Sequence, residues 1–303
     1  MPLKFGRLPA HAEADAPRLK LAPFLSGLEA PPAQVDWYSV VTDWPVYLND
    51  QIGDCTEAMV GHLIENASRY GYGWAVEIGD QDVLTAYERV SGYRPEDPST
   101  DQGAVLQDVY GDWRKNGVGG HRALVFAQVQ HQNLLEVRQA VQHFGAVGLG
   151  ITVTDNMMAD FQAGEPWRRA TGQVLGGHAV PVVGYDAEMV YVVTWGKVQP
   201  MAWGVFVHVV EEAWVAVLPE WFSSAGVDPE GVDLHGLGDA FAELTGEPNP
   251  FPAPGPEPVP PGPVVTADQV LAASARVWLG HHHTGTNKRF AQDVQAWITA
   301  KGL

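Results

Sequence analysis

The order of periodic segments in this 303-residue chain predicts an α+β fold, with helices first and an antiparallel sheet later. Apolar residues recur at helical spacing in the first half of the chain, for example at Ala58, Met59, Leu63 and Ala67. Val-rich runs such as HAVPVVG and MVYVVTWG occur in the second half and are typical of strands. We therefore expect a helical subdomain packed against a sheet.

The elements are expected in the following order. Residues 1–34 form an irregular arm that is rich in Pro and Ala. The main domain is expected over residues 35–224. Its helices are predicted over 55–70, 81–91, 103–116 and 132–144. Its strands are predicted over 146–153, 174–184, 188–195 and 213–218.

The character of the sequence changes after residue 224. Residues 225–265 hold at most one short helix, near 234–244, and then nine prolines in the sixteen residues PNPFPAPGPEPVPPGP. That composition favours polyproline II at about 3.1 Å per residue, so a linker is preferred over a ligand for a proline-binding module. Residues 266–303 are expected to form two helices, the first opened by a capping-box pattern of Thr266 with Gln269. So short a pair is expected to dock on the body, on another subunit or on a partner.

A net charge of −18 argues against partners that need a basic surface. Clustered Lys and Arg bind a nucleic-acid backbone and an anionic membrane surface, so we expect neither partner. No apolar run reaches the roughly 18 residues of a transmembrane helix, and the first residues lack the apolar region of a signal peptide. A single cysteine fits a cytoplasmic location, or a virion assembled in a reducing compartment. We expect no cofactor and no metal, because adjacent histidines such as His281, His282 and His283 diverge from one another.

The only cysteine, Cys55, and a histidine 123 residues later, His178, are the candidates for chemistry. Cys55 follows the polar turn NDQIGD and opens a helical segment, where unpaired backbone amides favour the thiolate over the thiol. The carboxylate of Asp54 acts in the opposite sense. Because cysteine is among the most buried residue types, a structural thiol in the core is the alternative interpretation.

His178 lies in the first of the two Val-rich runs, which the segment YDAE joins as a β-hairpin. A three-residue loop at 185–187 would place His178 directly opposite Thr194, whose hydroxyl would be within reach of the imidazole. A two- or four-residue loop would place Val193 or Trp195 there instead. The alternative for His178 alone is an ordinary histidine at the end of a strand.

Six segments between Val35 and Trp214, in this order along the chain, resemble the papain-like cysteine peptidases. They are VDW, QIGDC with the helix that follows, GAVLQDVYGDWRKNG, LLEVRQAVQHFGAVGLGITV, GGHAVPVVGYD and VVTWG. The whole pattern, including the opening MPLKFGRL, also resembles a group of actinobacterial and phage proteins of unclear role. The resemblance implies a papain-like α+β fold, with a cleft between the helix that bears Cys55 and the sheet that bears His178.

The resemblance also implies a role for each site residue. Cys55 would be the nucleophile, and His178 the general base and then the general acid. Gln51 would donate its side-chain amide to the oxyanion together with the Cys55 backbone N–H, and Asn49 is the substitute candidate. Counted from His178, Thr194 takes the position where the family has asparagine, and its hydroxyl can accept the imidazole N–H. Counted back from Trp195, Val193 takes that position, and valine cannot accept the proton.

Three functions of different classes follow. The first is a cysteine peptidase or amidase that acts on a peptide or on a peptidoglycan-like substrate. The second is a papain-like domain recruited as a structural component of a phage virion or another assembly, with weak or absent catalysis. The third is a binding protein that keeps the cleft.

The arm would lie over the surface or the cleft, and with the C-terminal helices it would contact protein partners or form a homo-oligomer. Trp195 would shield the contact between His178 and Thr194 if a bulge turned it to that face.

Overall fold

The computed structural model describes residues 3–39, 41–72, 76–221, 232–251 and 286–302, together with positions 268, 275 and 279. The chain divides into two compact units, Met1–Pro252 and Ala253–Leu303. The sheet and both candidate residues belong to the first unit. Most of the proline tract and the capping-box pattern at Thr266 lie outside the described residues.

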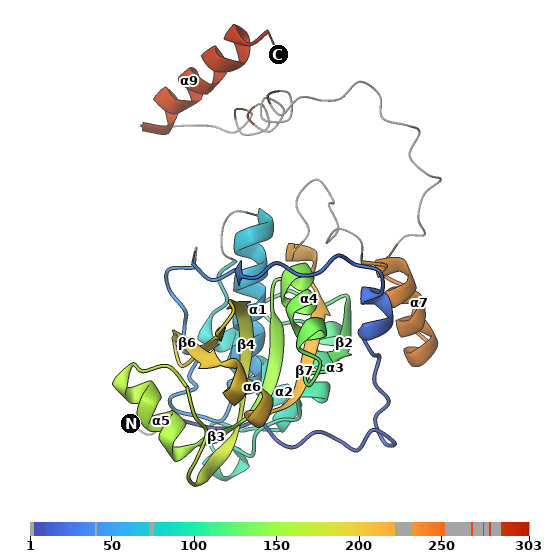
Figure 1. The fold of residues 1–303 in the computed structure, drawn as a ribbon, viewed down its shortest axis with the longest axis vertical. Helices are drawn as coiled ribbons and strands as arrows, with labels where there is room; N and C mark the ends of the chain where they lie inside the picture. The colour runs from blue at the N-terminus through green and yellow to red at the C-terminus, as the bar shows by residue number, and fades with distance from the viewer. Residues whose placement is uncertain are drawn as a thin grey trace. The chain divides into compact units, whose positions relative to one another are not determined.

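A seven-stranded sheet forms the centre of the first unit, and all its strand pairs are antiparallel over the described residues (Figure 1). Six strands follow the order β2-β7-β3-β4-β5-β6, and β1 pairs with β4 off that path. The strands are β1 (Val35–Asp36), β2 (Val125–Val129), β3 (Val147–Thr154), β4 (Val174–Tyr185), β5 (Met189–Thr194), β6 (Lys197–Ala202) and β7 (Val210–Val217). His178 therefore stands on β4, which has a neighbouring strand on each side.

Helices cover both faces of the sheet and bury a separate apolar core on each face (Figure 1). The first core includes α4 (Leu134–Phe144), α5 (Asp155–Ala163) and α6 (Trp203–Val209), and the second includes α1 (Cys55–Tyr72), α2 (Asp80–Ser91) and α3 (Leu106–Asn116). Strand β4 serves both cores, because successive side chains of a strand point to opposite faces. Val180 and Val182 belong to the first core, and Ala179 and Val183 to the second. The helix that begins at Cys55 thus packs directly on β4.

The predicted helices and long strands of the first unit are present to within a few residues. The elements β1, β2, β6, α5 and α6 were not predicted. Strand β6 contains Pro200, which a strand tolerates best at the edge of a sheet, and β6 ends the strand path. The run WGVFVHVVEEAWVAV passes from α6 into β7 without a Gly or Pro between them, so periodicity alone did not divide it.

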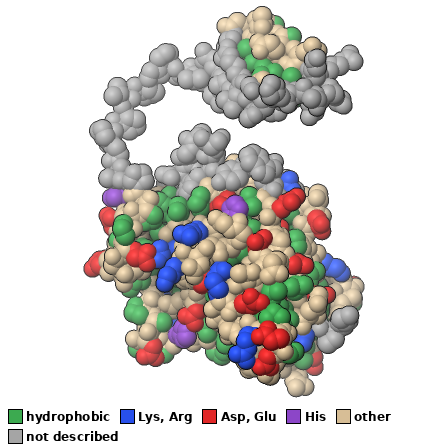
Figure 2. Space-filling model, turned by 180° about the vertical axis from the view of Figure 1, so that it is seen from behind, with side chains coloured by type: hydrophobic (Ala, Val, Ile, Leu, Met, Phe, Trp, Pro, Cys, Tyr) green, Lys and Arg blue, Asp and Glu red, His purple; other side chains and the backbone are tan. Residues whose placement is uncertain are grey.

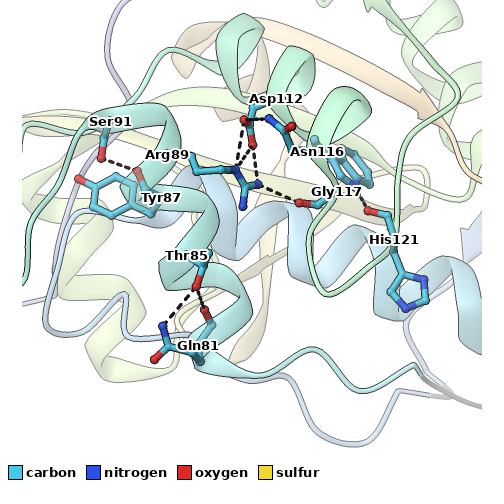
Figure 3. A network of polar contacts seen from close by, with 10 residues as sticks. Gln81, Thr85, Tyr87, Arg89, Ser91, Asp112, Asn116, Gly117 and His121 are labelled. Carbon is cyan, nitrogen blue, oxygen red and sulfur yellow. Dashed lines mark hydrogen bonds and ion pairs between the residues drawn. The ribbon is translucent and has the colours of Figure 1, made fainter.

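A polar network joins α2 to α3 (Figure 3). The Arg89 guanidinium forms an ion pair with Asp112 at 2.7 Å and donates to the Gly117 carbonyl at 2.9 Å. Asn116 also donates to Asp112, at 2.6 Å. The carboxylate of Asp112 therefore ties α2 to the C-terminal part of α3.

The N-terminal arm covers the outer edge of β2. The Leu21 amide donates to the Gln128 carbonyl at 2.9 Å, and the Gln128 amide donates to the Leu19 carbonyl at 2.7 Å. Since an uncovered edge is a template for pairing with another chain, this contact protects the sheet.

The face seen in Figure 2 carries basic side chains interspersed with acidic ones. Within the described part of the chain, no helix has both the length and the apolar character of a membrane span.

Two further helices lie toward the C-terminus. Helix α7 (Leu234–Thr245) belongs to the first unit and contributes Leu237 and Phe241 to its first core. Helix α9 (Thr286–Ala300) belongs to the second unit. Its apolar side chains are only partly buried, because Ile298 is 2% exposed whereas Phe290 is 60% exposed.

Candidate active site

Cys55 is the first residue of α1, as the sequence predicted, and its side chain is buried. The chain approaches it through a tight turn in which Tyr47 and Leu48 adopt positive φ angles of 56° and 69°. The predicted preference of the helix N-terminus for a thiolate is outweighed, because burial raises the pKa of Cys55 to about 12. The thiol is therefore protonated at neutral pH in this conformation.

His178 on β4 is held by Thr194 on β5, with Nε2 lying 2.7 Å from the threonine hydroxyl oxygen. The contact that the sequence predicted is thus present. His178 is 1% exposed, and its other ring nitrogen, Nδ1, has no hydrogen-bond partner among the described residues. When Nε2 carries the proton and donates to the hydroxyl, Nδ1 has a free lone pair that can accept a proton.

The hairpin that makes this contact has a different register from the predicted one. Its loop lies at 186–188, between the end of β4 and the start of β5, instead of at 185–187, and β4 bulges just before the loop. Beyond the bulge, Val182 pairs with Val192. Continuing that register places Thr194 diagonally across from His178 and not directly opposite it. Diagonal neighbours remain within reach of a long side chain such as histidine, so the contact survives the change of register.

Trp195 stacks on the His178 ring, with ring centroids 4.2 Å apart and planes 13° from parallel. Strand alternation would point this side chain to the other face, but Trp195 and Gly196 form the two-residue turn between β5 and β6. Both residues have positive φ angles, 43° and 77°, as tight hairpin turns require. This turn, and not the bulge invoked from the sequence, brings the indole onto the imidazole.

Residues Leu3–Leu8 cross the site and are named here the covering segment. The Phe5 ring meets the His178 ring edge-on, with centroids 6.0 Å apart. The Arg7 amide donates to the carbonyl of Gly177, the residue before His178, at 3.1 Å. The sequence predicted that the arm lies over the surface or the cleft but assigned no role to any residue of this segment. Its hydrogen bonds join residues far apart in sequence and follow no periodic pattern.

Glycines allow the covering segment to approach the backbone closely. A Cβ on Gly6 would stand 1.6 Å from the Gly53 carbonyl oxygen, and one on Gly103 would stand 2.1 Å from the Gly6 carbonyl oxygen. The Gly6 amide also lies beside the Cys55 thiol. Burial has the larger effect on the pKa of that thiol, and the amides of Ala179 and Gly6 act against it. The segment therefore fits the site only because these positions lack a side chain.

The candidate pair is electrically neutral in the covered state. Burial, with a smaller effect from the positive charge of Arg7, lowers the pKa of His178 to about 3. The pKa of Cys55 lies far above neutral pH and that of His178 far below it, so the proton stays on sulfur. A thiolate–imidazolium pair requires water or other polar groups to replace the covering segment.

The two oxyanion candidates lie in the turn before α1. Gln51 has an exposed side chain, and its backbone N–H donates to the Leu48 carbonyl at 2.7 Å. Asn49 is buried and donates from Nδ2 to the Ile52 carbonyl at 3.3 Å. Asn49 also lies near Asp54, where burial raises the pKa of the carboxyl well above its ordinary value. An oxyanion role for Gln51 or Asn49 stays a prediction.

Comparison with solved structures identifies the architecture. The chain is similar to xylellain, a cysteine protease from Xylella fastidiosa, with a TM-score of 0.54 and 16% identity over 71% of this chain and 97% of that one. It is also similar to procathepsin B from Trypanosoma congolense, with a TM-score of 0.52 and 13% identity over 71% of this chain and 86% of that one. The chain has a papain-like fold. Digestive procathepsin L 3 from Tenebrio molitor larval midgut gives a TM-score of 0.52 and 16% identity over 67% of this chain and 75% of that one.

At these identities the likeness establishes the papain-like fold alone. No protein-family profile and no curated protein sequence matches the chain. Among the described residues, no group of three or more His, Cys, Asp or Glu side chains is placed to hold a metal ion. The three adjacent histidines at 281–283 lie outside the described residues. The chemistry of this papain-like domain therefore has to be argued from the geometry of Cys55 and His178.

Proposed function

We propose that this protein is a cysteine peptidase or amidase whose reactive pair is kept neutral by the covering segment. One observation carries the proposal. The sole cysteine opens a helix packed on the strand of a histidine that is oriented through one ring nitrogen and has no hydrogen bond on the other. A thiol and an oriented imidazole are the minimal unit of thiol-based nucleophilic catalysis. The papain-like fold supports the same class of reaction.

Displacement of the covering segment would begin the reaction. Water would reach Cys55 and His178, and charge separation would become less costly because both groups would be solvated. His178 would accept the thiol proton at Nδ1 while Thr194 holds the ring through Nε2. The bond to Thr194 would also stabilise the imidazolium, since Nε2–H donates to a hydroxyl oxygen.

The thiolate would then attack the carbonyl carbon of a peptide or amide and form a C–S bond. The Cys55 backbone N–H, with Gln51 or Asn49, would donate to the oxyanion that develops. The imidazolium would transfer its proton to the departing nitrogen as the C–N bond breaks. Water, deprotonated by His178, would hydrolyse the thioester and return the pair to its starting state.

The close fit of the covering segment favours one second candidate, a papain-like domain that serves in an assembly without turnover. A segment that never leaves the site would admit no substrate. Its backbone touches Gly53 and Gly103, and its amides and carbonyls are hydrogen-bonded to the body of the domain. The two candidates differ in whether Cys55 becomes an activated thiolate once it is uncovered.

Alkylation of Cys55 by iodoacetamide tests the proposal in a full-length chain uncovered by Gly6→Ala. A fast reaction at about pH 5–6 that collapses when His178→Ala is added would show a thiolate–imidazolium pair. Cleavage of a mixed peptide library, abolished by Cys55→Ser, would then demonstrate turnover. A rate that follows an ordinary thiol, with a pKa of about 8.5, and no cleaved peptide would refute the peptidase proposal and favour the second candidate.

A further inference from the structure

The side chain of Arg7 is enclosed beside the candidate site by Gly150, Gly177, Glu211 and Glu212, and this enclosure is named the Arg7 pocket. Its side chain is 3% exposed, and its guanidinium forms ion pairs with Glu211 and, at 3.6 Å, with Glu212. It also donates to the Ile151 carbonyl at 3.4 Å. Ile151 pairs with His178 in the sheet, so the pocket lies one strand away from the histidine.

Glycines give this pocket the space for a long side chain. A Cβ on Gly150 would stand 2.7 Å from Cγ of Glu212 and 3.2 Å from Cδ of Arg7. A Cβ on Gly177 would stand 3.2 Å from Nε of Arg7. Any other residue type at either position would narrow the channel through which the guanidinium reaches the carboxylates.

Two carboxylates face the Arg7 guanidinium, and the charge of Arg18 also acts on Glu212, less strongly than that of Arg7. Glu212 is 1% exposed, and Trp214 Nε1 donates to its Oε2 at 2.8 Å. Its Oε1 makes no hydrogen bond within the described residues and points at the cation. Glu211 is half-exposed at the mouth, where the Thr152 hydroxyl donates to it at 2.5 Å. A buried carboxylate without a cation is strongly unfavourable, so the pocket requires a positive group.

We propose that this pocket is a specificity subsite that selects substrates with an arginine side chain, and that Arg7 occupies it in the covered state. Gly6 lies beside the Cys55 thiol and Arg7 is the next residue, so a substrate arginine seated there would lie close to the attacked bond. A guanidinium suits the pocket better than an ammonium, because its several donors reach two carboxylates and a carbonyl at once. The inference rests on the proposed peptidase function and narrows its substrates to arginine-containing peptides.

A binding measurement tests the subsite without requiring turnover. The full-length chain would carry Gly6→Ala to displace the covering segment and Cys55→Ser to prevent cleavage. The probe is fluorescein-labelled Lys-Phe-Gly-Arg-Leu-Pro, compared by fluorescence anisotropy with the same peptide in which citrulline replaces arginine. Citrulline keeps the shape of the side chain and removes its charge, so the ratio of the two affinities reports recognition of the cation.

The arginine peptide should bind at least about tenfold more tightly, as expected for a charge-assisted, partly buried contact. Glu211→Gln with Glu212→Gln should bring the ratio close to one. Glu136→Gln, at another buried glutamate on α4, is the matched control and should leave the ratio unchanged. Equal affinities of the two peptides would overturn the proposal, and so would an affinity ratio that the double substitution leaves unchanged.

A second measurement uses a chain in which the covering segment keeps its glycine. In Arg7→Ala, millimolar arginine amide should raise the melting temperature and citrulline amide should not, because only the first restores the cation. Equal effects of the two amides, or no effect of either, would count against the subsite. Arginine preference without peptide cleavage by the uncovered chain would refute only the peptidase proposal. Cleavage without arginine preference would refute only the subsite.

Discussion

Substituting Gly6 with alanine should drive the covering segment off the reactive pair. A Cβ there would stand 1.6 Å from the Gly53 carbonyl oxygen, whereas real Cβ contacts stay above 3.0 Å. Both partners belong to the backbone, so no change of rotamer relieves the clash. The segment must leave and give up main-chain hydrogen bonds such as those from Arg7 to Gly177 and from Leu8 to Ala104.

The expected gain in thiol reactivity follows from the pKa of Cys55. Burial holds that pKa at about 12, so the thiolate fraction at pH 7 is about 10⁻⁵. An ordinary thiol, with a pKa of about 8.5, has a thiolate fraction about 10³ times larger at the same pH. Because intrinsic nucleophilicity falls with pKa, the net gain in alkylation rate is about 10² before the easier access of the reagent is counted.

The assay is the rate of iodoacetamide addition, measured by intact mass. Cys55 is the only cysteine, so each added group reports this one thiol. Leu8→Ala is the matched control, because this exposed side chain belongs to the same segment and its removal leaves the backbone bonds in place. A folded Gly6→Ala chain, judged by circular dichroism, that reacts no faster than the wild type would refute the covering role.

Three further predictions concern the orientation of the histidine and the buried charges. In the uncovered chain, Thr194→Val should slow peptide cleavage about five- to tenfold, because it removes one hydrogen bond worth about 1 kcal/mol. Thr194→Ser keeps the hydroxyl and should retain most of the activity. Equal losses in the two variants would contradict the orienting role of Thr194. Burial raises the pKa of the Glu57 carboxyl to about 8, so the folded state keeps a proton that the unfolded chain releases. The contribution of this group to stability therefore falls as pH rises from about 4.5 to about 8, and it is constant above that pH. Glu57→Gln, which can still accept from the Thr56 hydroxyl, should flatten the urea midpoint over that range, and an unchanged slope would show that the carboxyl is not buried as described. In the covered chain, Arg7→Ala should lower the free energy of unfolding by about 3 kcal/mol, because Glu212 loses its cation. Burial raises the pKa of Glu212, so the loss should be smaller at acidic pH, where that carboxyl takes a proton, and a loss that grows on acidification in chemical denaturation would contradict this account.

The contact between His178 and Thr194 shows how far reasoning from a hairpin pattern carries. Alternating Val-rich strands around YDAE predicted that His178 and Thr194 meet, and they do. The predicted register was wrong, because the bulge in β4 depends on packing and leaves no distinct mark in the sequence. The position of Trp195 was missed for a related reason: a two-residue turn with positive φ overrides strand alternation.

The sequence by itself determined the α+β order of elements, the helix that begins at Cys55 and the strand that bears His178. Those features depend on local periodicity and turn chemistry, which neighbouring residues encode. Only the tertiary structure decided that Leu3–Leu8 covers the pair and that Arg7 meets a carboxylate 204 residues away at Glu211. It also decided the protonation of the pair, because desolvation depends on which parts of the fold exclude water from a side chain and not on its neighbours in sequence.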